Sequence, residues 1–226
     1  MCGICGIINF DNRSVELKDL HAMNDQMAHR GPDDDGYYRD SNIGIAMRRL
    51  SIIDLEGGQQ PLSNEDGSIW IVLNGEIYNY IELRKKLLLK GHKFRTNSDT
   101  EVILHLYEDK GFKAVDDLNG MFAFALYDSR KKGLWLVRDR LGIKPLYYLQ
   151  TKKRFIFASH LKSIRLMEKL KVSSESLLNY LGLAYVPTPM SIYEGVKKLL
   201  PGHYLWIERD QISQKKYWQV SEIQTW

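Results

Sequence analysis

The sequence predicts an α+β layered domain, and two observations lead to it. Apolar strand-like segments and segments of helical periodicity come in separate blocks instead of alternating as strand–helix–strand units. A chain of 226 residues, 44% apolar and 27% charged, has the composition of an ordinary globular protein. That length fits one domain, or one domain with a short appendage.

The first half of the chain opens with a predicted buried strand at 3–10, because this segment is apolar and rich in isoleucine. Apolar residues at 17–27 then recur at helical spacing, and Gly31-Pro32 stops that helix. Further expected elements are strands at 43–47 and 69–73, a helix at 81–90 closed by Gly91, and a helix through Lys110, opened by the capping box Ser98-Asp99-Thr100-Glu101 and closed by Gly111.

The second half is dominated by predicted hairpins. Alternating apolar segments separated by short polar turns indicate paired strands at 121–128 with 134–139 and at 145–150 with 155–159. Two helices at 161–170 and 174–183 follow, and a last hairpin spans 204–218 around Arg209-Asp210. The domain is expected to cover 1–218, with 219–226 as a tail or the start of a linker.

Charge and composition argue against several classes of partner. A net charge of +4 without a long run of like charge gives no reason to expect nucleic-acid binding. No apolar stretch approaches the roughly 18 residues of a membrane span, and the N-terminus lacks the features of a secretory signal. With only two cysteines, the chain is expected to be cytoplasmic and to contain no disulfide framework.

Cys2 is the first candidate for chemistry, because removal of Met1 would make it the N-terminal residue. A thiol and a free α-amine would then share one Cα atom. The amine has an ordinary pKa of about 7.7–8.0 and can accept the proton of its own side chain near neutral pH. On position alone, an ordinary residue after the initiator is the simpler interpretation.

Cys5 offers an alternative, a C-x-x-C redox or metal pair with Cys2. No second cysteine pair completes a zinc site, and the six histidines show no ligand-like spacing. Positions three apart in a strand point to opposite faces, so the two thiols are not expected to meet. We therefore expect Cys5 to be a small buried residue, and we expect no metal site.

Seven segments together carry a resemblance to a known family: MCGICGI at 1–7, HRGPDDDG at 29–36, RLSIIDLEGGQQPL at 49–62, NGEIYNY at 74–80, NSDTEVI at 97–103, LNGMFAFALYD at 118–128 and RDRLGIKPLYY at 138–148. In this order the chain resembles class II glutamine amidotransferases over 1–218. The RLSIID segment favours the branch of glutamine-hydrolysing asparagine synthetases. The resemblance implies a four-layer αββα sandwich, the N-terminal nucleophile hydrolase fold, with Cys2 at the end of an inner strand.

Site residues follow from the resemblance by position. Cys2 would be the nucleophile and Asn74 and Gly75 the oxyanion hole, although an Asn-Gly pair on its own predicts a turn. Arg49 would hold the glutamine α-carboxylate and Asp99 the α-ammonium. The pocket wall is expected from Leu50, Ile52 and Ile53, with Glu76 as a further substrate contact. Arg30 and Asp139 also lie in family segments and are expected to be structural.

The implied activity is hydrolysis of the glutamine side-chain amide through a Cys2 thioester. The ammonia would serve an ATP-dependent synthetase domain or partner chain. ATP and magnesium are expected only in that domain or chain. This chain lacks its pyrophosphate-binding loop and is expected to need no cofactor of its own. The segment SQKKYWQV resembles the chain just before such a domain. Two alternatives stay open: the same chemistry with a sugar, peptide or natural-product carboxylate as acceptor, or a non-catalytic glutamine-binding or docking module. Formation of a homodimer is also left open.

Overall fold

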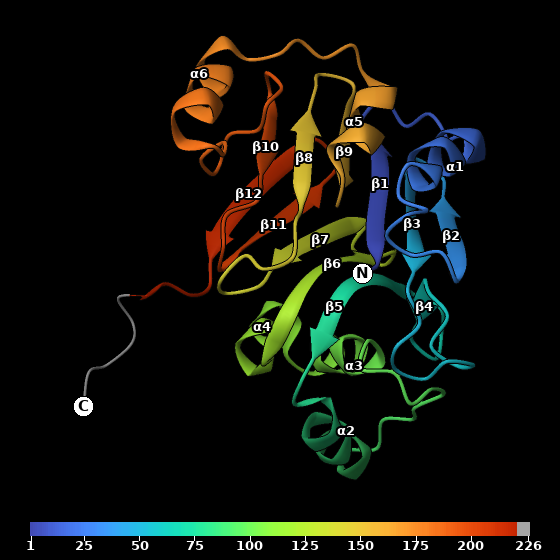
Figure 1. Ribbon diagram of the computed structural model, residues 1–226. Coiled ribbons are helices and arrows are strands. Elements are labelled where there is room, and N and C mark those ends of the chain that lie inside the picture. Colours follow the sequence, from blue (N-terminus) through green and yellow to red (C-terminus); the bar gives the residue numbers. More distant parts are fainter. Residues whose placement is uncertain (221–226) are drawn as a thin grey trace.

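A computed structural model describes residues 1–220, and it consists of two stacked β-sheets with helices on their outer faces (Figure 1). Both sheets are antiparallel and six-stranded. The four layers confirm the α+β class and the αββα sandwich. No helix among residues 1–220 is long and apolar enough to cross a bilayer.

The first sheet is built around the N-terminal strand. Its order is β10-β8-β9-β1-β3-β2, so β1 is hydrogen-bonded on both sides, to β3 and to β9. This pairing explains why a strand can begin almost at the first residue, where chains usually fray. The strands are β1 Gly3–Asn9, β2 Asp34–Asp40, β3 Ile43–Arg49, β8 Tyr147–Gln150, β9 Arg154–Ala158 and β10 Val196–Lys198.

The second sheet carries the longest strands, in the order β12-β11-β7-β6-β5-β4. Its centre is the three-stranded meander β5, β6 and β7, extended by the hairpin of β11 and β12. The strands are β4 Leu62–Ser63, β5 Ile69–Ile77, β6 Gly120–Asp128, β7 Gly133–Arg138, β11 His203–Glu208 and β12 Gln211–Lys216.

Helices divide between the two outer faces. Those that pack on the first sheet are α1 Leu17–Asp25 and α5 Leu161–Met167; those on the second are α2 Tyr80–Leu89, α3 Glu101–Lys110, the 3-10 turn Gly111–Lys113 and α4 Ala114–Asp117. The remaining helix, α6 Ser174–Leu183, lies at the edge of the molecule beyond β10 (Figure 1).

Side-chain alternation along β1 separates two hydrophobic layers. Ile4 and Ile8 pack between the sheets, whereas Cys5 and Ile7 pack toward α1 and α5. Cys2 belongs to the layer between the sheets, so the thiols of Cys2 and Cys5 point to opposite sides, as the strand period predicts. Burial raises the pKa of the Cys5 thiol, which fits a packing residue.

The expected hairpins and helices are present, with differences at their ends. The structure places β5 through Ile77, beyond the predicted end at 73, so the Asn74-Gly75 pair continues a strand and the turn interpretation is wrong. The predicted capping box is also wrong: Glu101 accepts from the backbone N–H groups of Arg95 and Thr96, not from that of Ser98. Elements that the sequence did not predict are β2, β4, β10, α4 and the 3-10 turn Gly111–Lys113.

The expected tail at 219–226 falls mostly outside the described residues, which end at Val220. The boundary at 218 therefore stays a prediction.

Candidate active site

A cavity of about 140 Å³ lies where β1 begins, between the ends of β3 and β5 and the start of α3. Its lining contains every residue that the sequence placed in the site: Cys2, Arg49, Leu50, Ile52, Ile53, Asn74, Gly75, Glu76 and Asp99. Drug-sized pockets typically measure about 300–1,000 Å³, so this one suits a ligand nearer the size of an amino acid. Four segments far apart in the chain thus meet around one half-buried thiol.

Cys2 is held just outside the first residue of β1. Its Sγ accepts from the backbone N–H of Leu50 at 3.4 Å and lies 3.6 Å from the Leu50 carbonyl oxygen. The Arg30 Nε donates to the Cys2 carbonyl oxygen at 3.0 Å. Met1 lines the same cavity and is 57% exposed.

Arg49 ends β3 with its guanidinium buried against the following loop. It donates to the carbonyl oxygens of Ile53, Asp54 and Leu55 at 3.1, 2.7 and 3.2 Å. These bonds use both Nη2 hydrogens and one Nη1 hydrogen, which leaves Nε–H and one Nη1–H of the five donors. Gly58 permits this arrangement, because a Cβ there would lie 2.5 Å from the Arg49 Nη2.

Asn74 and Gly75 lie in β5, opposite Ala123 and Phe122 of β6. The Asn74 side chain is buried; its Nδ2 is 3.5 Å from the Ser159 Oγ, at the limit of a hydrogen bond, and its Oδ1 has no partner. A buried carboxamide this poorly paired is open to a ligand. At position 75 only glycine fits, since a Cβ would lie 2.2 Å from the Met121 carbonyl oxygen.

Asp99 is 5% exposed and lies just before α3. Its Oδ2 accepts from the Ile77 N–H at 2.8 Å. Burial raises the pKa of Asp99, and the charge of Glu76 raises it further, although the Ile77 hydrogen bond opposes the shift. Two acidic side chains therefore line the cavity close enough to interact, and a cationic ligand group would relieve their repulsion.

Gln60 and Lys144 also line the cavity, and sequence reasoning did not single them out. The Gln60 Oε1 accepts from the Leu73 N–H at 2.6 Å, and its Nε2 donates to the Thr100 Oγ1 at 3.1 Å, so this side chain bridges β5 and the start of α3. Lys144 is 6% exposed. Both residues lie inside the sequence segments that resemble the amidotransferase family, and that position was the only sign in the sequence that they could line the site.

Asp139 has the geometry expected of a structural residue. Its carboxylate accepts from the backbone N–H groups of Phe122, Leu141, Ile143 and Lys144 at 2.9–3.3 Å. It therefore shapes the loop that brings Lys144 to the cavity.

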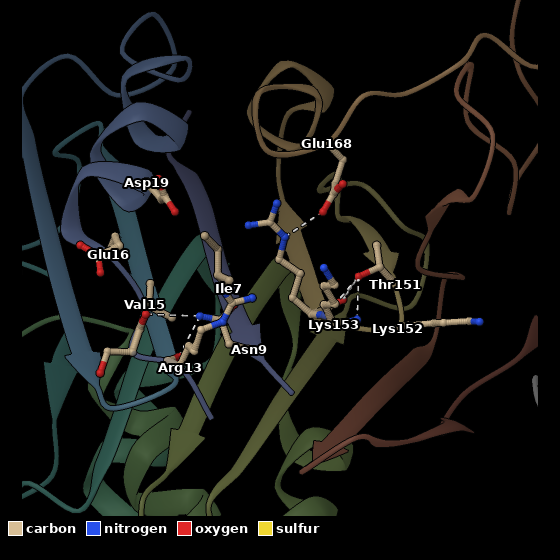
Figure 2. Close-up of a pocket in the computed structure, with 12 residues that line it drawn as sticks. Ile7, Asn9, Arg13, Val15, Glu16, Asp19, Thr151, Lys152, Lys153 and Glu168 are labelled. Carbon is tan, nitrogen blue, oxygen red and sulfur yellow. Dashed lines mark hydrogen bonds and ion pairs between the residues drawn. The ribbon is translucent and has the colours of Figure 1, made fainter. Parts of the chain in front are cut away.

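A larger cavity of about 810 Å³ lies at the other end of β1, around Asn9 (Figure 2). Its lining contains both acidic and basic side chains, and the Arg154 Nε lies 2.8 Å from the Glu168 Oε1 in an ion pair. None of the predicted site residues lines it. The chemistry-bearing residues gather at the smaller cavity instead.

Two antiparallel sheets stacked between helical layers are the αββα sandwich of the N-terminal nucleophile hydrolase fold. The glutamine phosphoribosylpyrophosphate amidotransferase from B. subtilis superimposes with a TM-score of 0.69, at 19% identity, over 96% of this chain and 49% of that one. At this identity the likeness establishes the shared fold.

The chain belongs to the glutamine amidotransferase domain family, whose sequence model matches residues 1–218. It is 44% identical over 241 residues to asparagine synthetase [glutamine-hydrolyzing] 2 of Bacillus subtilis, covering 99% of this chain and 31% of the relative. Asparagine synthetase [glutamine-hydrolyzing] 1 of the same organism is 42% identical over 226 residues, covering 98% and 36%. The chain thus spans about a third of the length of these relatives.

Proposed function

We propose that this chain hydrolyses the side-chain amide of L-glutamine through a thioester on Cys2, after Met1 has been removed. The observation that carries the proposal is the convergence of Cys2, Arg49, Asn74 and Asp99 on one cavity of amino-acid size. These four groups supply a nucleophile, a cation, an amide donor and an anion, which match the functional groups of glutamine.

Substrate binding uses both charges of the amino acid. The guanidinium charge of Arg49, which lines the cavity, binds the α-carboxylate. Asp99, with Glu76 beside it, holds the α-ammonium. Leu50, Ile52 and Ile53 form the wall. Because the two charged anchors fix the orientation, the side-chain amide is directed toward Cys2.

The chemistry proceeds by acyl transfer. The free α-amine of Cys2 takes the thiol proton, and the sulfur attacks the amide carbon of glutamine. The Asn74 Nδ2 and the Gly75 N–H stabilise the oxyanion. The carbon–nitrogen bond then breaks as the protonated amine gives its proton to the departing ammonia, which leaves a thioester. Water, deprotonated by the same amine, hydrolyses the thioester and releases glutamate.

We propose further that the ammonia serves an ATP-dependent synthetase domain or chain that forms asparagine. The names and the greater length of the relatives support this acceptor. The helix α6 also leaves Leu178, Leu181 and Leu183 more than half exposed, as expected of a face that another domain covers. In the full-length protein, Cys2→Ala should abolish glutamine-dependent asparagine formation and preserve ammonia-dependent formation.

A glutamine analogue with a diazoketone tests the nucleophile directly. Incubated with the processed chain, it should add once, and peptide mapping should place the adduct on Cys2. Chain that retains Met1 is the matched control and should stay unmodified. An unmodified processed chain that still binds glutamine would instead indicate a non-catalytic binding module.

A further inference from the structure

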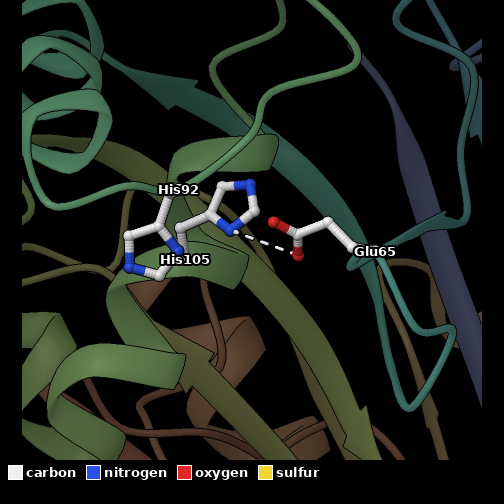
Figure 3. A group of neighbouring side chains, drawn as sticks. All are labelled: Glu65, His92 and His105. Atoms are coloured by element: carbon white, nitrogen blue, oxygen red, sulfur yellow. Dashed lines mark ion pairs between the residues drawn. The ribbon is translucent and has the colours of Figure 1, made fainter.

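A group of ligand-type side chains lies in the outer helical layer, and none of them lines the glutamine cavity. Glu65 comes from the β4–β5 loop, His92 from the segment after α2, and His105 from α3. One ligand atom from each lies within 4.8 Å of the others, and Figure 3 shows the two rings side by side with the Glu65 carboxylate facing them. We propose that this group, with Glu108, is a binding site for a divalent metal ion of the zinc class.

Glu108 supplies the fourth ligand, one turn along α3 from His105. Its Oε2 lies 3.0 Å from the His105 Nδ1 and 3.7 Å from the His92 Nδ1. The Glu65 Oε2 lies 3.9 Å from the His105 Nδ1. In a tetrahedral site with metal–ligand bonds of about 2.0–2.1 Å, ligand atoms lie about 3.4 Å apart. These three separations fall on either side of that value, and the Glu65 and His92 ligand atoms lie within 4.8 Å of each other, so side-chain movement would have to bring the four ligands to one ion.

One of the two ring nitrogens that face away from the group is oriented by a further carboxylate, whereas the other lies near a carboxylate without a hydrogen bond to it. The Asp109 Oδ1 lies 2.9 Å from the His92 Nε2, and the Glu101 Oε1 lies 3.7 Å from the His105 Nε2. Metal-binding imidazoles commonly donate their other N–H to a carboxylate, which fixes the tautomer and directs the free lone pair to the metal. Here the Asp109 contact would direct the Nδ1 lone pair of His92 into the group.

Without a metal ion, only ring protons can neutralise this group, as on the His105 Nδ1, which lies 3.0 Å from the Glu108 Oε2. With Nε2 protonated in each ring, two Nδ1 lone pairs face the carboxylates of Glu65 and Glu108. His105 is only 1% exposed, so water screens this repulsion weakly. A single proton can pair one ring nitrogen with one carboxylate, whereas one divalent ion satisfies both nitrogens and both carboxylates together.

The donor set indicates the class of metal. Two imidazole nitrogens with carboxylate oxygens suit zinc and its transition-metal neighbours, whereas calcium and magnesium prefer all-oxygen sites. His92 and His105 come from different segments, so the linear sequence contains no ligand motif.

A bound ion would tie the β4–β5 loop and the α2–α3 connection to α3. Glu101, whose Oε1 lies 3.7 Å from the His105 Nε2, also accepts from the N–H groups of Arg95 and Thr96 at 2.8 Å. Metal binding would therefore stabilise the segment 95–98, which precedes Asp99.

Zinc titration of the full chain tests the proposal. The titration is made in a Cys2→Ala background, so that the N-terminal thiol cannot compete. One equivalent of Zn²⁺ should bind with a dissociation constant of about 1 µM or tighter, as expected of structural zinc sites. Co²⁺ bound in its place should give the visible absorption of a tetrahedral ion.

The variants are chosen from partly exposed ligands, which should fold, as far-UV circular dichroism can check. Glu65→Gln and His92→Gln should each weaken zinc binding at least about 100-fold, and Asp109→Asn about 10–100-fold. His29→Gln removes an exposed histidine elsewhere and should change nothing. Absence of stoichiometric binding, or binding that His29→Gln removes and Glu65→Gln preserves, would show that the group is a proton-linked ion-pair cluster and overturn the proposal.

Discussion

The Sγ atom of Cys2 accepts a hydrogen bond from the backbone N–H of Leu50, the residue that follows Arg49. This contact joins the start of β1 to the end of β3, whose pairing begins at Gly3 opposite Arg48. The proposed nucleophile and the proposed carboxylate-binding side chain are therefore fixed relative to each other by a β-ladder. The proposed reaction would therefore use groups held by a rigid frame.

Replacement of Cys2 is expected to abolish glutamine hydrolysis without unfolding the chain. Cys2→Ala should lower kcat at least about 10³-fold, because no other group in the cavity can form the thioester. Cys2→Ser should be nearly as inactive, since a hydroxyl is far less ionised than a thiol near pH 8. Glutamate release and thermal unfolding measure the two effects.

Cys5→Ala is the matched control for that experiment. It removes the other thiol, which is fully buried, and should cost about 1 kcal/mol of stability while preserving hydrolysis. Wild-type activity in Cys2→Ala, or lost activity in a folded Cys5→Ala, would refute the assignment of the nucleophile.

Asn74→Ala should act on the transition state. Loss of one oxyanion donor typically costs about 3–4 kcal/mol, so kcat should fall about 10²–10³-fold while KM for glutamine stays nearly constant. Steady-state kinetics separate the two parameters. A rise in KM with unchanged kcat would assign Asn74 to ground-state binding instead.

Arg49→Ala should weaken glutamine binding by about 1.5–3 kcal/mol, seen as a higher KM. The structure adds a second consequence, because the same side chain binds three carbonyl groups of the 53–55 loop. The variant should therefore also lower the melting temperature. An unchanged KM in a folded variant would remove Arg49 from the substrate site.

Acidification should weaken glutamine binding through Asp99. Burial raises its pKa, so the carboxylate gains a proton at a pH above the ordinary aspartate value of about 3.9. The ionised form that binds the α-ammonium is thus lost as the pH falls, and KM should rise in that range. Asp99→Asn should show a high KM without this rise.

Glu76→Gln is the control for the pH experiment, because the charge of Glu76 contributes to the raised pKa. In this variant the rise in KM should move to lower pH. An acid-dependent rise that persists in Asp99→Asn would place the titrating group elsewhere.

Gly75→Ala should destabilise the protein, since the added Cβ would lie 2.2 Å and 2.6 Å from backbone atoms of Met121 and Phe122. We expect a loss of at least about 3 kcal/mol, measured by denaturant unfolding. Gly182→Ala in α6 has open space around it and should instead stabilise slightly, by about 0.5–1 kcal/mol. Equal stability of the two variants would contradict the close β5–β6 approach.

Local pattern was sufficient for much of the fold. The apolar strand at the N-terminus and the hairpins of β6–β7, β8–β9 and β11–β12 follow from side-chain alternation and turn residues. Local pattern did not predict β2, a polar edge strand whose sequence DDGYYRD lacks an apolar face, or the two-residue strand β4. Such strands exist because a neighbouring strand offers hydrogen bonds, which no local pattern records.

The candidate site was predicted by resemblance, since its residues come from separate segments. Nothing in the local sequence around Arg49 indicated that three of its donors are occupied by loop carbonyls. The bridging role of Gln60 and the meeting of His92 with His105 likewise depend on tertiary packing.

The mass of the active species tests the central claim most directly. Chain purified on the basis of glutamine-hydrolysing activity should, by intact mass spectrometry, lack the initiating methionine and begin at Cys2, and fractions that retain Met1 should be inactive. Full turnover by chain that still carries Met1 would contradict the account, because an acylated nitrogen cannot accept the thiol proton.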